Sequence, residues 1–142
     1  MGEAAGPSTD ELELVRTARR LLAKYYRPGS HHIVCALQCR GNIYPALHLN
    51  SSGRDVCAEP VALANAILAG ENRFDRIVAV ASGGPNVEDG IVVPPCGDCR
   101  QILLEYAPEV MVLLTIEGGL TSASAVDLLP HPYAKPLKGH FE

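Results

Sequence analysis

The sequence predicts an α/β fold in which a mixed sheet of about five strands lies between helices, a three-layer α/β/α sandwich. Two observations support this prediction. Apolar segments of strand length alternate with longer segments of helical pattern along the chain, and no internal repeat is visible. The 142 residues, 47% of them hydrophobic and 20% charged, suffice for one core and are too few for two ordinary domains. We therefore expect a single domain over 1–142, with a flexible tail at 1–7.

The first half of the chain predicts a helix followed by a β-hairpin. A helix over 8–26 begins at a capping box, in which Ser8 and Glu11 are three residues apart. The segments 31–39 and 43–50 then have the pattern of two strands joined by a tight turn at Gly41 and Asn42.

The second half alternates helices with strands. The run 58–70 is apolar on all sides, which is typical of a buried helix, and Gly70 suits its C-terminal cap. The remaining elements are a buried strand, a polar turn-rich connection, a third helix, a core strand, and a short edge strand running into a helical turn, over 76–82, 83–95, 96–107, 110–116 and 120–130.

Composition narrows the classes of partner. The chain has no 18-residue apolar run and no N-terminus of the secretory type, so we expect a cytoplasmic protein with reduced thiols and no membrane partner. The net charge is -4 and no stripe of Lys and Arg is present, which argues against nucleic acid. A small-molecule substrate is the better prediction.

Two short motifs, "DVCAEP" and "PPCGDCRQ", contain three of the five cysteines. Cys57, Cys96 and Cys99 fall at the starts of two predicted helices, where the helix dipole favours thiolates. The C-x-x-C spacing lets two sulfurs face one ion, and a third sulfur leaves one tetrahedral position open, the pattern of a catalytic zinc. Cys35 and Cys39 share a face of the first predicted strand and are expected to be buried core thiols.

Glu59 follows Cys57 by two residues. A carboxylate in a first helical turn can simply be favoured by the dipole. Beside a zinc ligand it can instead take a proton from water and pass it to a substrate nitrogen. Pro60 fits the same first turn because its missing N–H has no intrahelical partner there.

The combination of C-x-E with P-C-x-x-C is the three-cysteine form of the zinc-deaminase signature. With "CAE", "PPCGDCRQILLEY" and "DLLPHPY", the chain resembles the cytidine deaminase family over most of its length. The resemblance implies the cytidine-deaminase-like fold, one Zn²⁺ per chain held by Cys57, Cys96 and Cys99, and Glu59 as the catalytic proton shuttle. It also implies a hydrolase, often a homotetramer, that releases ammonia from an amino-pyrimidine nucleoside.

The resemblance further suggests residues that bind the substrate. The positions at which the family holds the ribose are His48 and Asn50 here, a stacking position falls near His31, and Tyr133 is placed to complete a neighbouring subunit's site. Ala58 and Pro95, beside the ligands, complete the expected set. The histidines 31, 32 and 48 also fit strand ends that face solvent or an interface.

Departures from the family pattern concern the substrate. His48 and Asn50 replace the ribose-holding pair, and the loop between His48 and Cys57 has a length more similar to the blasticidin-S deaminase branch, so a modified cytosine nucleoside is a candidate beside cytidine and deoxycytidine. Pro60 stands where the family commonly has an Arg. Arg54 and Arg100 are candidates to offset the thiolate charge, or ordinary surface arginines.

Three other functions stay open at this point. A deaminase-fold protein could keep the metal and act on a different amino-heterocycle or lack turnover. A redox protein could join Cys96 and Cys99 in a disulfide, and an editing enzyme could act on bases in RNA or DNA.

Overall fold

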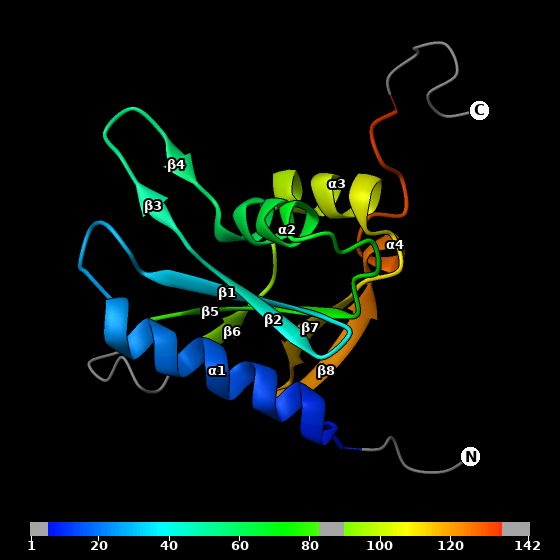
Figure 1. Cartoon of the computed structure of the whole chain (residues 1–142), viewed down its shortest axis with the longest axis horizontal. Helices are drawn as coiled ribbons and strands as arrows, with labels where there is room; N and C mark the ends of the chain where they lie inside the picture. Colours follow the sequence, from blue (N-terminus) through cyan, green and yellow to red (C-terminus); the bar gives the residue numbers. More distant parts are fainter. Residues whose placement is uncertain (1–5, 83–89, 135–142) are drawn as a thin grey trace.

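The structure, a computed structural model, describes residues 6–82 and 90–134. A mixed sheet forms its middle layer, with strands in the order β2-β1-β5-β7-β8 and β6 paired with β5. Helix α1 covers one face, and α2 and α3 cover the other (Figure 1). The predicted three-layer α/β/α arrangement is confirmed. Of the expected tail 1–7, residues 1–5 lie outside the described part of the chain.

Helix α1, Thr9–Tyr25, begins at the predicted capping box. The Ser8 hydroxyl accepts a hydrogen bond from the Glu11 backbone N–H, and the Glu11 side chain accepts one from the Ser8 backbone N–H. The helix buries one stripe, which includes Leu14, Ala18 and Leu22, against β1 and β5. Within the described residues, no helix combines the length and the apolar character needed to cross a bilayer.

Strands β1, Ile33–Cys39, and β2, Asn42–Leu47, form the predicted hairpin. Cys39 pairs with Asn42, so the two-residue turn is Arg40-Gly41, one position earlier than predicted. Both turn residues have positive φ, 52° and 84°, as the hairpin turn that matches strand twist requires. The Arg40 backbone N–H donates to Asp75 Oδ2 at 2.8 Å, which stabilises this conformation of a non-glycine residue.

The expected second strand over 43–50 is interrupted at His48. Beyond it, β3, Leu49–Asn50, and β4, Asp55–Val56, form a separate two-stranded ribbon. The ribbon projects away from the main sheet (Figure 1) and leads directly into Cys57.

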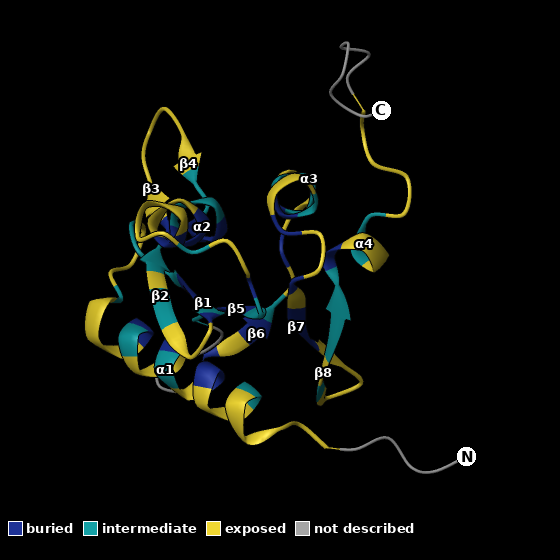
Figure 2. Ribbon diagram, turned by 45° about the vertical axis from the view of Figure 1, so that its right-hand side comes forward, coloured by how far each residue is buried: buried dark blue, intermediate teal, exposed yellow. Residues whose placement is uncertain are grey.

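Helix α2, Ala58–Leu68, ends at Ala69, and Gly70 follows with a φ of 96°, as its capping role predicts. The prediction that this helix is buried on all sides was wrong. Ala62, Leu63 and Ala66 lie in the core, but Ile67 and Leu68 are 43% and 88% exposed. The reason is that α2 belongs to an outer layer, where only one face of a helix meets the sheet (Figure 2).

The second half of the sheet contains one strand more than expected. β5, Arg76–Ala81, pairs in parallel with β7, Met111–Ile116, through its first residues and antiparallel with β6, Ile91–Val93, through its last. We predicted the segment 83–95 as connection only, because three residues are too few to show a strand pattern. β8, Gly119–Ser124, forms the edge and runs into α4, Ala125–Leu128, as predicted.

Candidate metal centre and active site

Two helix starts meet above the sheet and bring the three cysteines together. Cys57 is the N-cap residue of α2, and Cys96 is the N-cap residue of α3, Gly97–Tyr106. Cys99 lies in the first turn of α3. The three sulfurs lie within 4.8 Å of one another, although Cys57 and Cys96 are 39 residues apart in the chain.

The spacing of the sulfurs fits one zinc ion. Two sulfurs bound at about 2.3 Å to one tetrahedral ion lie about 3.8 Å apart. The Cys57 and Cys96 sulfurs are 3.8 Å apart. Three protein ligands leave the fourth tetrahedral position open, as in catalytic sites. Cys35 and Cys39 are fully buried in β1 and belong to the core, as predicted.

The three thiols differ in acidity because their surroundings differ. Burial raises the pKa of Cys57, and burial together with the nearby Glu59 raises the pKa of Cys99 strongly. For Cys96, burial acts in the same direction, but hydrogen bonds from the Cys99 backbone N–H and from the neighbouring thiols outweigh it and lower the pKa. A cation at this point would stabilise all three thiolates.

Glu59 lies in the first turn of α2 and is 7% exposed. Its Oε1 atom is 3.8 Å from the Cys99 sulfur, so the carboxyl group lies beside the three cysteine sulfurs. Burial raises the pKa of Glu59, while hydrogen bonds from its own backbone N–H and from the Cys99 thiol act in the opposite direction. A carboxyl group with a raised pKa is suited to accept and return a proton near neutral pH.

A small hollow of about 170 Å³ opens beside these groups. Cys57, Glu59 and Cys96 line it on the metal side, and Ala58 lies between them. His48 and Asp55 line the side that leads to the ribbon. The structure therefore brings two of the predicted substrate residues, Ala58 and His48, into contact with the space beside the metal group.

His48 is held firmly, and it is 5% exposed. Its backbone N–H donates to the Ile33 carbonyl, and its own carbonyl is 3.2 Å from His31 Nδ1. Its ring meets the His32 ring edge to face, with centroids 4.3 Å apart. The ring atom Nε2 is 4.0 Å from Asp55 Oδ1, while Nδ1 is buried without a partner among the described residues.

The other predicted substrate residues lie outside the lining of the hollow. His31 contacts the backbone of His48, with its Nδ1 atom 3.2 Å from the His48 carbonyl oxygen. Asn50 is exposed on the ribbon, where its backbone N–H donates to the Ser30 carbonyl. Pro95 is buried beneath Glu59, on the core side.

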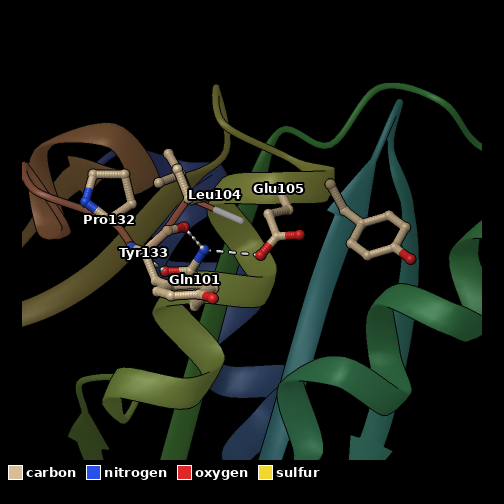
Figure 3. Close-up of a pocket in the computed structure, with 7 residues that line it drawn as sticks. Gln101, Leu104, Glu105, Pro132 and Tyr133 are labelled. Atoms are coloured by element: carbon tan, nitrogen blue, oxygen red, sulfur yellow. Dashed lines mark hydrogen bonds between the residues drawn. The ribbon is translucent and has the colours of Figure 1, made fainter. Parts of the chain in front are cut away.

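Tyr133 lies on the outer side of α3. Its backbone N–H and carbonyl both bond the Gln101 side-chain amide, at 3.1 and 2.9 Å (Figure 3). The residue is 65% exposed and lies beside a hollow of about 490 Å³ between α3 and the C-terminal segment. Within this one chain, Tyr133 is not part of the metal centre.

Neither arginine candidate contacts a thiol. Arg100 donates from Nε to the Pro95 carbonyl at 2.9 Å and from a terminal nitrogen to the Leu128 carbonyl at 3.3 Å, so it ties the Cys96 loop to α4. Arg54 is exposed in the ribbon turn. The two helix N-termini are thus the positive partners of the sulfurs that the structure shows.

Sequence reasoning missed two residues. Asp55 lines the hollow, and its one signal in the sequence is its position two residues before Cys57. Gln101 clamps the C-terminal segment, and nothing in a single sequence pairs it with Tyr133, 32 residues away.

The sequence and the structure both match known deaminases. The family model for the cytidine and deoxycytidylate deaminase zinc-binding region matches residues 8–115. The chain is 36% identical to a blasticidin-S deaminase of Bacillus cereus, covering 90% of this chain and 95% of that protein. It is 29% identical to a cytidine deaminase of Sporosarcina psychrophila, covering 89% and 93%. Among solved structures, a cytidine deaminase from Burkholderia pseudomallei matches with a TM-score of 0.68 and 30% identity, over 86% of this chain and 98% of that one.

Proposed function

The chain belongs to the cytidine and deoxycytidylate deaminase family, and from that premise we propose that it hydrolyses the amino group of a cytosine nucleoside. Three sulfurs around one point, with a buried carboxyl group 3.8 Å from one of them, carry the proposal. Blasticidin S is the first candidate substrate, because the similarity to a blasticidin-S deaminase is higher than that to a cytidine deaminase. Cytidine and deoxycytidine are the next candidates.

Each site group has a role in this reaction. Cys57, Cys96 and Cys99 would hold the zinc ion, which would supply Lewis-acid chemistry that lets water lose a proton near neutral pH. Glu59 accepts a proton from that water on a carboxylate oxygen and delivers it to the ring nitrogen next to the amine-bearing carbon. Once the C–O bond has formed, Glu59 takes the second proton, from the added hydroxyl group, and passes it to the amine, so that a carbonyl forms as the C–N bond breaks and ammonia departs. Burial keeps bulk water from competing for these protons.

The hollow suits a small planar ring. Its volume of about 170 Å³ is below the range of roughly 300–1,000 Å³ that holds a whole drug-sized ligand. The reacting ring can therefore enter while the sugar extends toward the ribbon and His48. The net charge of -4 supports a small molecule over nucleic acid as the partner. Five free cysteines suit a compartment that keeps thiols reduced, so we place the protein in the cytoplasm.

We also propose that the enzyme is a homotetramer and that α2 and α3 contribute to its interfaces. Leu68, Tyr106 and Ile67 are 88%, 61% and 43% exposed around a groove of about 590 Å³ between these helices. Both helices lie in the outer layer, side by side (Figure 2). Exposed apolar patches of this kind commonly mark protein interfaces. Light scattering should give a mass four times that of the chain, with a smaller species for Leu68→Asp. A monomeric wild-type protein would contradict this assembly.

A substrate panel tests the reaction. Zinc content is measured first, with one ion per chain expected. Ammonia release is then followed for blasticidin S, cytidine, deoxycytidine and a guanine-type base, and we expect the cytosine nucleosides to react. If cytidine reacts fastest, the replacement of the ribose-holding pair by His48 and Asn50 has less effect on the choice of substrate than the sequence suggests. A zinc-loaded protein that releases ammonia from none of them would overturn the proposal and favour a binding protein.

A further inference from the structure

The charges of the chain are unevenly distributed. Residues 14–54 contain seven Lys and Arg and no Asp or Glu, so this segment has a formal charge of +7 in a chain whose net charge is -4. Three of these basic residues, Arg16, Arg20 and Lys24, belong to α1, and Arg27 follows in the turn after it. A strong separation of charge within a chain indicates a surface that attracts anionic partners.

Arg16, Arg20 and Lys24 form one stripe along α1, which we call the basic stripe. Residues four positions apart are neighbours on the surface of a helix, and all three are exposed. The buried stripe of α1 packs on β1 and β5, and Figure 2 shows exposed residues along the side of the helix that is turned away from the sheet. The expectation that the chain has no stripe of Lys and Arg was therefore wrong, because only the helix aligns residues that stand apart in the sequence.

The charges of the basic stripe are largely free to meet a partner. Arg16 forms an exposed ion pair with Glu13, with a terminal nitrogen 3.4 Å from Oε2. Within residues 6–82 and 90–134, no ion pair involves Arg20 or Lys24. Lys24 Nζ is 5.3 Å from the centroid of the Tyr25 ring, so this charge lies beside an aromatic surface.

An apolar hollow of about 190 Å³, which we call the α1 hollow, lies beside the basic stripe. Leu21 and Tyr25 follow Arg20 and Lys24 by one position each and form its wall on the helix, while β1 and β2 form the other wall. Its lining consists of Leu21, Tyr25, Val34, Pro45, Ala46 and Leu47. The volume is below the roughly 300–1,000 Å³ that holds a drug-sized ligand, so the α1 hollow suits a single apolar side chain.

We propose that the basic stripe and the α1 hollow together form a docking surface for an acidic protein segment. The segment inserts one apolar side chain beside Tyr25 and places Asp or Glu side chains against Arg20 and Lys24. Charge complementarity requires an anionic partner, and the α1 hollow favours a protein segment because a bilayer surface is too flat to enter it. A nucleic-acid backbone offers phosphates but no aliphatic side chain to fill an apolar hollow.

This surface is separate from the metal centre. α1 covers one face of the sheet, and α2 and α3, which carry the cysteines, cover the other (Figure 1). A partner can therefore dock on α1 while the hollow beside Glu59 stays open, and the inference does not depend on the proposed deamination.

Fluorescence anisotropy tests the surface with a labelled peptide of Glu residues around one central Phe. The full chain should bind this peptide at low salt, and Arg20→Glu should weaken binding on the order of tenfold, because it places like charges against each other. Lys24→Glu gives a second test of the same charge contact. Replacing Phe by Gly in the peptide should also weaken binding on the order of tenfold, because burial of the ring is lost. High salt should weaken binding of both peptides.

Arg73→Glu is the matched control. It makes the same change in net charge at an exposed residue between α2 and β5, so peptide binding should stay at the wild-type value. Failure of the wild-type protein to bind, unchanged binding by both α1 variants, or equal binding of the peptide without Phe would overturn the docking surface. Tighter binding of single-stranded RNA or of phosphatidylserine vesicles than of the peptide would overturn the choice of a protein segment as the partner.

Discussion

Replacing Glu59 by Gln tests the assignment of the proton shuttle. Gln has nearly the same shape, so the cysteine group should still hold one zinc per chain. The amide cannot accept and return a proton, and the residue is 7% exposed, so bulk water has little access to take its place. A positioned acid/base group contributes roughly 10²- to 10⁴-fold in rate, and we expect the upper part of that range. This corresponds to about 4 to 5.4 kcal/mol in activation free energy.

The assay is single-turnover ammonia release together with zinc content. Glu109→Gln is the matched control, because Glu109 is exposed at the end of α3's outgoing loop and should leave the rate unchanged. A Glu59→Gln enzyme with full zinc and a rate within threefold of wild type would refute the role of Glu59. Loss of zinc in this variant would instead show that the carboxyl group is needed to form the metal site.

The same substitution has a consequence for stability. Burial raises the pKa of Glu59, so the metal-free folded state binds its proton more tightly than the unfolded chain does. The protonated Glu59 side chain therefore contributes to the free energy of unfolding at low pH, and this contribution is lost as the pH rises through the raised pKa. At pH 7 the wild-type protein therefore has the free-energy cost of a buried carboxylate, which the uncharged side chain of the Glu59→Gln variant does not have. With chelator present, Glu59→Gln should be the more stable protein at pH 7, and the difference should shrink toward pH 4 in denaturant unfolding.

Three further predictions follow from the metal centre and the core. Because the pKa values of Cys57 and Cys99 are raised in the metal-free protein, zinc binding should release protons, and the affinity for zinc should increase as the pH rises from 6 to 8. Competition with a coloured chelator measures this affinity, and an affinity that does not depend on pH would contradict the thiol assignment. Arg100→Ala should lower zinc affinity roughly 10- to 100-fold, because the Pro95 carbonyl loses its partner, and Arg100→Lys should restore part of it. Leu113→Ala, at a fully buried position of β7, should cost about 2 to 5 kcal/mol of unfolding free energy in urea denaturation, and a cost below 1 kcal/mol would contradict its place in the core.

Local signals predicted the order of the elements well. The Ser8 capping box, the hairpin and Gly70 are each specified by residues close in sequence, and the structure confirms all three. The elements that were missed have weak local signals. β6 is three residues long, and the ribbon strands β3 and β4 have two residues each, so their pairing depends on neighbours from elsewhere in the chain.

The exposed face of α2 shows a different limit. An apolar helix surface is the same in sequence whether it meets the core or another molecule. The pattern therefore indicated burial of Ile67 and Leu68, and the position of α2 in an outer layer leaves them exposed in the single chain. Only the arrangement of the layers distinguishes these cases.

In the metal centre, too, some features were predictable from the sequence and others depended on how the elements pack. The C-x-E and C-x-x-C spacings by themselves predicted a group of three sulfurs and one carboxyl group, because each spacing places its residues within one helical turn. Tertiary structure decided that the two turns meet, with sulfurs from α2 and α3 3.8 Å apart. It also decided that Asp55 and His48 face the same hollow, and that Tyr133 lies on the far side of α3. Chemistry carried within one turn is visible in sequence, whereas a wall built from separate elements exists only after those elements pack.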